Sequence, residues 1–155
     1  MALEDDIAFL EEVPTLALLG RPALRILAIG VEARKVPSGA VLFYAGDLAD
    51  CGYVIQEGSF MLEDDRPGQH EETHAGPGTL LGDLALITDT VRTATATAQE
   101  PSVVIRIPRT LFLKMLEGYP EAARTLRDAM AERLEEWTRD LTTVKAKLES
   151  GAKET

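Results

Sequence analysis

Hydrophobic residues recur at steps of three and four over residues 3–34, which is the period expected of amphipathic helices. The apolar positions are Ile7, Leu10, Leu16, Leu19, Leu24, Leu27 and Ala28. Pro14 and the Gly-Arg-Pro sequence at 20–22 interrupt the pattern, because proline is poorly tolerated inside a helix. The beginning of the chain is therefore predicted to form two or three short helices.

From Arg34 the period changes to two, which is typical of β-strands with one buried face. Short runs rich in β-branched and aromatic residues alternate with turns that contain Gly, Pro or Asp. The runs are VLFYAG (41–46), YVIQEG (53–58), SFMLED (59–64), RTATATA (92–98) and SVVIRIP (102–108). Many short strands at this spacing predict a β-sandwich or barrel, which we place at residues 34–107.

The helical period returns at Pro108 and predicts helices over residues 108–149, with a break near Gly118. From Met130 onward the apolar positions form a heptad seam, made of Met130, Leu134, Trp137, Leu141, Val144 and Leu148. For the first three turns of this last helix, packing on the protein's own β-body and association with another chain are both open. Beyond Trp137 the helix would extend past a small barrel, so self-association is favoured there.

The length of 155 residues, with 45% hydrophobic and 27% charged residues, predicts one globular domain over residues 1–155. The net charge of −10 argues against nucleic acid and anionic membrane surfaces as partners, because both are negatively charged. No apolar run approaches the roughly 20 residues that span a bilayer, and the acidic N-terminus lacks the basic segment of a signal peptide. We therefore expect a cytoplasmic protein, and the single cysteine, Cys51, fits a reducing compartment.

Candidate catalytic and metal-binding residues are few. His70 and His74 flank Glu71 and Glu72 in a predicted hairpin, where exposed histidines are more often surface residues than metal ligands. The sequence has no Ser-His-Asp or Cys-His arrangement with supporting context. We therefore expect neither an enzyme nor a metal site.

The segment LLGDLALITDTVRTATATAQ at 80–99 is the strongest candidate for a binding site. A short helix after Gly82 would point its first backbone N–H groups at an anion. Arg92 would bring a guanidinium to the same place, and its planar fork suits two phosphate oxygens. Asp83 would accept a hydrogen bond from a ribose hydroxyl, so the pattern suggests a nucleotide. The alternative is a structural ion pair of Arg92 with Asp83 or Asp89.

The chain from about Leu16 to Leu134 resembles the cyclic nucleotide-binding domains of the catabolite-activator and cyclic-nucleotide-gated-channel superfamily. The matching pieces stand in family order: VPSGAVLFYAGD (36–47), YVIQEGSF (53–60), GPGTLLGDLALIT (76–88), RTATATA (92–98) and VIRIPRTLFLKML (104–116). The third and fourth pieces contain the pattern of the family's phosphate-binding cassette. The resemblance implies an α+β fold with an eight-stranded antiparallel, jelly-roll-like β-roll, N-terminal helices and a long C-terminal helix.

Carried over position by position, the resemblance also implies a set of ligand contacts. The backbone at Gly82, Leu84 and Ala85 would donate to the cyclic phosphate, and Arg92 would pair with the phosphate charge. Asp83 stands where the family usually has glutamate for the ribose 2′-hydroxyl. It is one methylene shorter than glutamate, so this contact is expected to be longer or water-mediated.

Three further positions of the resemblance concern the base and the lid of the pocket. Thr93 stands at the Ser/Thr position that reaches the phosphate or a purine amino group. Arg133 and Trp137 stand at lid positions, where either would stack on a purine; the alternatives are a solvated charge for Arg133 and a core or seam residue for Trp137. Leu81 replaces a common aromatic residue and Val91 a common proline, and neither change removes a polar contact.

The resulting expectation is a stand-alone cyclic nucleotide receptor that is not an enzyme, with cAMP favoured over cGMP and no metal. Binding would be relayed through the C-terminal helix to a homodimer seam or an effector protein. Only SGAKET follows that helix in this sequence, too little for a DNA-binding domain. The alternative is a degenerate cyclic nucleotide-binding fold that serves as a protein–protein interaction module without ligand. The presence of Arg92 favours ligand binding.

Overall fold

A computed structural model describes residues 2–64 and 72–132 of the chain. The chain begins with three short helices, α1 (Ala2–Glu11), α2 (Pro14–Ala17) and α3 (Arg21–Gly30). Pro14 and Pro22 lie in the first turns of α2 and α3, where a missing N–H costs nothing. The prediction of two or three N-terminal helices is confirmed, and the breaks fall at the prolines.

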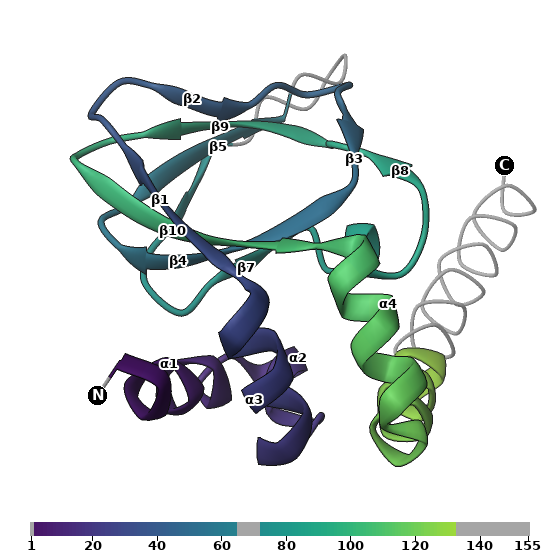
Figure 1. The fold of residues 1–155 in the computed structure, drawn as a ribbon. Coiled ribbons are helices and arrows are strands. Elements are labelled where there is room, and N and C mark those ends of the chain that lie inside the picture. Colours follow the sequence, from purple (N-terminus) through teal and green to yellow (C-terminus); the bar gives the residue numbers. More distant parts are fainter. Residues whose placement is uncertain (1, 65–71, 133–155) are drawn as a thin grey trace, which may run out of the picture.

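Ten strands follow in the described residues, and every pairing between them is antiparallel. Their bounds are β1 (Glu32–Val36), β2 (Val41–Phe43), β3 (Leu48–Ala49), β4 (Cys51–Glu57), β5 (Phe60–Asp64), β6 (Glu72–Ala75), β7 (Leu80–Leu81), β8 (Thr90–Val91), β9 (Ala94–Ala98) and β10 (Ser102–Pro108). Two four-stranded sheets, in the orders β1-β10-β4-β7 and β2-β9-β5-β6, face each other as the two walls of a roll (Figure 1).

The α+β class and the antiparallel β-roll are therefore confirmed, with two differences in detail. The eight strands of the larger sheets are joined by a separate two-stranded sheet of β3 and β8, so the described residues contain ten strands where eight are expected. Strand β1 begins at Glu32, ahead of the predicted start of the roll at 34. Four of its five residues are exposed, so it lacks the apolar alternation that marks a strand in the sequence.

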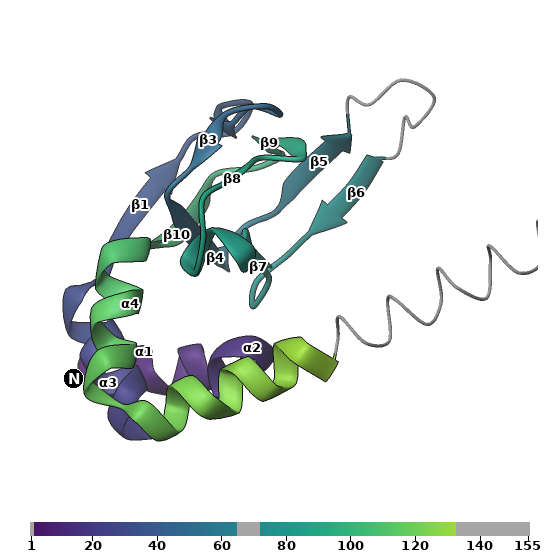
Figure 2. The same cartoon turned by 90° about the vertical axis from the view of Figure 1, so that its right-hand side faces the viewer.

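Helix α4 (Arg109–Gly118) leaves the roll after β10, and residues 120–132 form a further helix. Figure 2 shows α1–α3 and residues 120–132 gathered at one end of the roll, with α4 leading from the roll to them. None of the described helices has the length and apolar character needed to cross a bilayer. The heptad seam beyond Met130, from Leu134 to Leu148, lies outside the described residues.

Two hydrophobic cores meet at the sheet that contains β4 and β10. Val54, Ile105 and Ile107 face the helices and pack with α1, α3 and α4. The alternate positions Ile55 and Val104 face the inside of the roll and pack in a second core. Leu126 is buried in the helical core and Met130 packs against it. Two interpretations were open for the first turns of the last helix, and the structure supports packing on the protein's own body.

Candidate ligand-binding site

A pocket of about 260 Å³ opens into the roll, and the segment from Leu80 to Ala94 forms most of its wall. This segment runs from β7 through a turn of 3₁₀ helix, η1 (Leu84–Leu86), to β8 and the start of β9. Phe43, Ala49 and Leu62 complete the lining. Six sequence-predicted site residues meet here: Gly82, Asp83, Leu84, Ala85, Arg92 and Thr93. The other two, Arg133 and Trp137, lie outside the described residues.

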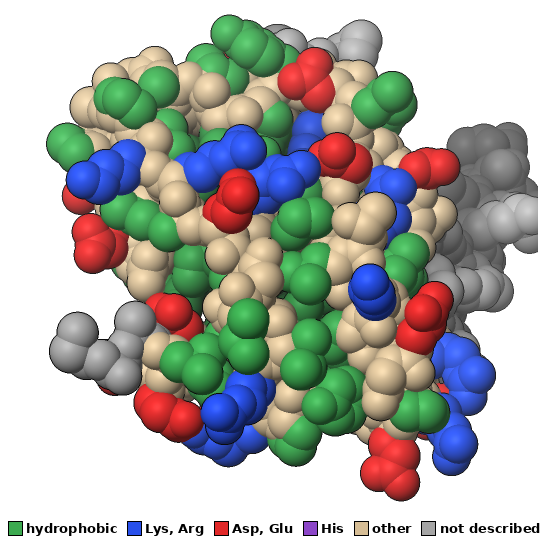
Figure 3. Space-filling model, viewed as in Figure 1, with side chains coloured by type: hydrophobic (Ala, Val, Ile, Leu, Met, Phe, Trp, Pro, Cys, Tyr) green, Lys and Arg blue, Asp and Glu red, His purple; other side chains and the backbone are tan. Residues whose placement is uncertain are grey.

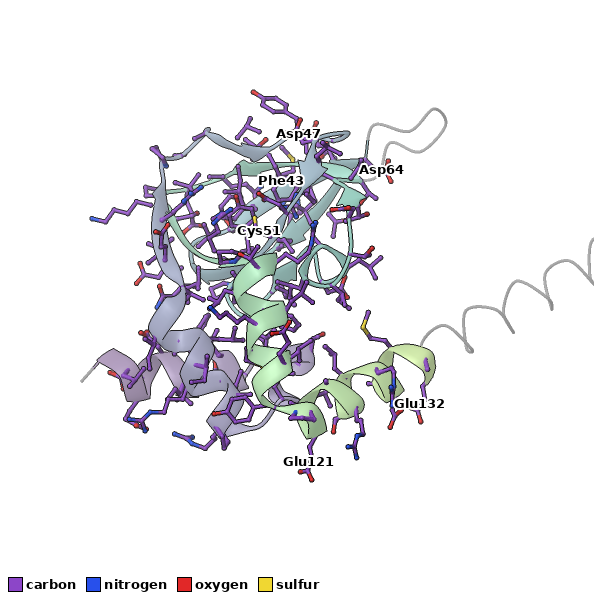
Figure 4. The ribbon with its side chains drawn as sticks, turned by 45° about the vertical axis from the view of Figure 1, so that its right-hand side comes forward. Phe43, Asp47, Cys51, Asp64, Glu121 and Glu132 are labelled. Carbon is purple, nitrogen blue, oxygen red and sulfur yellow. The ribbon has the colours of Figure 1, made fainter. Side chains whose placement is uncertain are left out.

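The side chain of Arg92 is held inside the roll at only 7% exposure. Its Nη2 atom donates a hydrogen bond of 2.8 Å to the carbonyl oxygen of Cys51. Its guanidinium carbon lies 4.4 Å from the ring centroid of Phe43 and 5.4 Å from that of Tyr53. Figure 4 shows Phe43 and Cys51 within the roll. The carbonyl and the two rings fix the guanidinium before any ligand arrives.

One nitrogen of this fixed cation lacks a partner. Among the described residues, Nη1 of Arg92 is buried and makes no hydrogen bond. A buried charged donor is unfavourable unless it is paired. An acceptor at Nη1 would therefore stabilise the arrangement, and an anion is the best acceptor for a cation. The structure thus pre-positions a positive charge at the wall of a pocket large enough for a small molecule.

The alternative of a structural ion pair for Arg92 is not what the described residues show. Asp89 pairs with Arg109 instead, at 2.6 Å between Oδ1 and Nη1. Asp83 turns its Oδ1 atom back to the N–H of Leu84, at 2.9 Å, and so caps η1. The N–H of Ala85 donates to the carbonyl of Gly82 at 3.1 Å. Two of the expected backbone donors, at Leu84 and Ala85, are therefore engaged within the turn.

Sequence reasoning missed two parts of this site. The first is the aromatic support of Arg92, in which Phe43 and Tyr53 lie 6.0 Å apart with their rings inclined by 24°. Burial is the main reason that the pKa of Tyr53 is raised, and a hydrogen bond with Cys51 raises it further. The second part is Arg109, whose side chain bonds the pocket wall from outside. The apolar alternation in VLFYAG (41–46) indicates that Phe43 points into the roll, but it does not indicate that Phe43 contacts Arg92.

In the part of the chain that the structure describes, no group of three or more His, Cys, Asp or Glu side chains is placed to hold a metal ion. His74 lies on β6 with its Nδ1 atom 3.0 Å from Oε1 of Gln99. His70 lies outside the described residues.

A β-roll that carries a buried, partly unpaired arginine beside a glycine turn has the arrangement expected of one class of protein, the domains with a site for a small anionic ligand. Comparison with known proteins gives the family within that class. The family model named Cyclic nucleotide-binding domain matches residues 33–119. The chain belongs to this family.

Relatives carry the same domain in longer proteins. A protein of the NTE family from Mycobacterium tuberculosis is 36% identical over 125 residues, which cover 81% of this chain and 21% of that protein. The cyclic AMP receptor protein of Thermus thermophilus is 33% identical over 107 residues, which cover 68% of this chain and 50% of that protein. This chain therefore spans half or less of these two curated relatives.

A solved structure agrees with the family assignment. The cyclic nucleotide-binding-like protein from Brucella abortus is 37% identical, with a TM-score of 0.65, and the match covers 73% of this chain and 98% of that one. This similarity extends over nearly the whole of the Brucella chain, so the two proteins share one fold over most of this chain.

Proposed function

We propose that this domain is a cyclic nucleotide receptor, in which Arg92 binds the cyclic phosphate and no reaction is catalysed. The observation that carries the proposal is the buried Nη1 atom of Arg92, which has no partner among the described residues. A cyclic phosphate carries one negative charge and two exocyclic oxygens, which suits a guanidinium already fixed by Cys51 and two rings. The family and the pocket lining support the same ligand class.

We infer that cAMP is preferred to cGMP. Thr93 lines the pocket, and its hydroxyl can accept from the amino group of either purine, so the preference rests on similarity to known proteins. A relative of 33% identity is named a cyclic AMP receptor protein. Asp83 would serve the ribose 2′-hydroxyl, because a carboxylate that accepts from the N–H of Leu84 at Oδ1 has further acceptor sites.

We also propose that binding is relayed through the last helix to a second copy of the chain or to an effector protein. Support comes from the helical core, where Leu86 of η1 shares a cluster with Phe112 of α4 and Leu126 of the next helix. A movement of η1 on binding would therefore be felt by both helices. A cytoplasmic location fits a receptor with one unpaired, buried cysteine.

Nucleic acid remains an unsuitable partner in this proposal. The net charge is −10, and Figure 3 shows Lys and Arg side chains over β1 and β10 with acidic side chains between them. These strands carry Arg34, Lys35 and Arg106, and Arg106 lies 3.6 Å from Asp50. Such a mixed row does not provide the continuous basic face that a phosphate backbone requires.

A second candidate function, a protein–protein interaction module without ligand, is favoured by one observation. Leu48 and Val91 are partners across β3 and β8, and their exposed fractions are 86% and 49%. Both side chains are apolar and exposed, and Val91 lines the pocket, so a protein partner would bury them favourably. The two functions differ in whether the pocket binds nucleotide.

Calorimetric titration with cAMP and cGMP tests the proposal. Wild-type protein is expected to bind cAMP, and Arg92→Ala is expected to lose at least ~30-fold in affinity, because two phosphate oxygens are involved and each charge-assisted hydrogen bond contributes roughly 1.5–3 kcal/mol. Arg34→Ala, which removes an exposed arginine from β1, is the matched control and should bind normally. Unchanged affinity in Arg92→Ala would refute the phosphate assignment. A folded wild-type protein that binds neither nucleotide would favour the interaction module.

A further inference from the structure

Arg109 is the first residue of α4, and its side chain is 18% exposed. Each of its three nitrogens donates a hydrogen bond to a different segment. Nε donates to the carbonyl of Ala85 in η1 at 2.9 Å, Nη1 to Oδ1 of Asp89 at 2.6 Å, and Nη2 to the carbonyl of Ala49 in β3. The backbone N–H of Arg109 also donates, to the carbonyl of Asp50 at 2.9 Å. One residue of α4 therefore connects three separate stretches of the roll.

Two of these acceptors belong to the wall of the pocket. Ala49 and Ala85 both line it, so Arg109 holds that wall from the side opposite the ligand. Ala49 is also paired with Thr90 of β8, two positions before Arg92. The bonds from Arg109 therefore reach η1, which precedes Arg92 in the chain, and β3, which pairs with β8 just before Arg92.

The same helix is packed into the helical core. Phe112 and Met115 of α4 are buried there together with Leu86 of η1 and Leu126 of the following helix. A shift of η1 must therefore either break the bonds of a largely buried guanidinium or carry the start of α4 with it. Breaking them is unfavourable, because charge-assisted bonds to buried carbonyls are strong and their acceptors would be left unpaired.

We propose that Arg109 is a positioning residue that couples the pocket wall to α4, so that a change in the pocket alters the protection of α4 and of residues 120–132. The coupling to nucleotide rests on the proposed function, whereas the mechanical link between the pocket wall and α4 does not. Asp89 contributes less than the two carbonyls, because its side chain is 96% exposed and its ion pair is screened by solvent.

Amide hydrogen exchange over residues 109–118 and 120–132 provides the test. Arg109→Lys keeps the charge but loses the planar fork, and Arg109→Gln loses both. Arg25→Lys, an exposed arginine of α3, is the matched control. With saturating cAMP, the wild type and Arg25→Lys should show the same change in exchange over these residues. In Arg109→Lys the change caused by cAMP, measured against the same variant without nucleotide, should fall by about threefold or more.

A double-mutant cycle of Arg92→Ala with Arg109→Lys tests the mechanical link without nucleotide. Arg92→Ala should alter amide exchange in α4 when Arg109 is present. The effects of Arg92→Ala and Arg109→Lys on this exchange should be non-additive by about threefold or more. Additive changes, or a normal nucleotide response in both Arg109 variants, would overturn the coupling. If the wild type binds neither nucleotide but the cycle is non-additive, the proposed function fails and the link between wall and helix stands.

Discussion

Gly82 and Arg92 occupy adjoining space at the wall of the pocket: a Cβ atom at position 82 would overlap Nη1 of Arg92. Nη1 is the same atom that is buried without a partner among the described residues. The glycine also has a φ of +85°, which residues with a side chain adopt only at a cost. The turn glycine and the cation therefore belong to one arrangement, in which the missing side chain leaves room beside the nitrogen.

Gly82→Ala should consequently weaken nucleotide binding and folding together. The positive φ alone costs roughly 1–2 kcal/mol of stability, and displacement of the guanidinium should reduce cAMP affinity by about tenfold or more. Gly78→Ala is the matched control, because Gly78 has a φ of +88° and open space around its missing Cβ. Urea unfolding and calorimetry should show a similar loss of stability in both variants but a loss of affinity in Gly82→Ala only. Equal affinity losses would contradict the steric argument.

Asp83 should determine whether the domain recognises the ribose 2′-hydroxyl. We expect the wild type to bind cAMP roughly tenfold more tightly than 2′-deoxy-cAMP, because a hydrogen bond to a charged acceptor contributes roughly 1.5–3 kcal/mol. Asp83→Ala should abolish this preference, and Asp83→Glu should retain it. The ratio of the two affinities separates recognition from capping: loss of the bond from Leu84 to Asp83 would loosen η1 and weaken both nucleotides equally. A preference that persists in Asp83→Ala would disprove the contact.

The alkaline stability of the domain should depend on Tyr53. Burial, followed by the bond with Cys51, raises its pKa above the ordinary value of 10.0, so the folded state favours the neutral phenol. The resulting stabilisation is fully present below about pH 10 and is lost as the pH rises through the folded-state pKa. In guanidinium unfolding at a series of pH values, Tyr53→Phe should lose less stability than the wild type above pH ~10. Tyr44→Phe, which removes a phenol that is 59% exposed, is the control. Parallel curves for Tyr53→Phe and the wild type would count against this role.

The site could be predicted from the sequence to the extent that it is local in the chain. All six predicted residues lie between β7 and β9 and line the pocket: Gly82, Asp83, Leu84, Ala85, Arg92 and Thr93. The glycine turn and the alternating strand after it leave a visible pattern in the sequence. The prolines in the first turns of α2 and α3 also leave a visible pattern.

The parts that the sequence does not reveal depend on contacts between distant segments. Phe43 and Tyr53 reach Arg92 only because the two sheets fold over each other. The sequence of neither strand indicates that its aromatic ring contacts Arg92. Two acceptors of Arg109 are backbone carbonyls, at Ala49 and Ala85, which any residue type would supply. Strands β3 and β8 have two residues each, too few to show a period.

The two halves of the last helix should have separable functions. Leu126 and Met130 pack in the helical core, and residues 120–132 adjoin α4. The seam residues Leu141, Val144 and Leu148 lie outside the described residues, and their heptad spacing in the sequence predicts burial by a second copy of the chain or by another protein. Such burial would contribute roughly 1.5–3 kcal/mol for each side chain.

Truncation after Arg139 should therefore leave cAMP affinity within about threefold of the full chain while abolishing dimerisation or partner binding. Sedimentation of the full and the truncated chain, with and without cAMP, measures dimerisation directly. Leu141→Glu in the full chain should reproduce the loss, because it places a charge in the seam, whereas Thr142→Glu, one position off the seam, should not. If the full chain is monomeric in both states and truncation instead destroys nucleotide binding, the distal segment belongs to the pocket. The apolar positions of the seam would then serve to cover the ligand, and the output of the receptor would have to pass through α4.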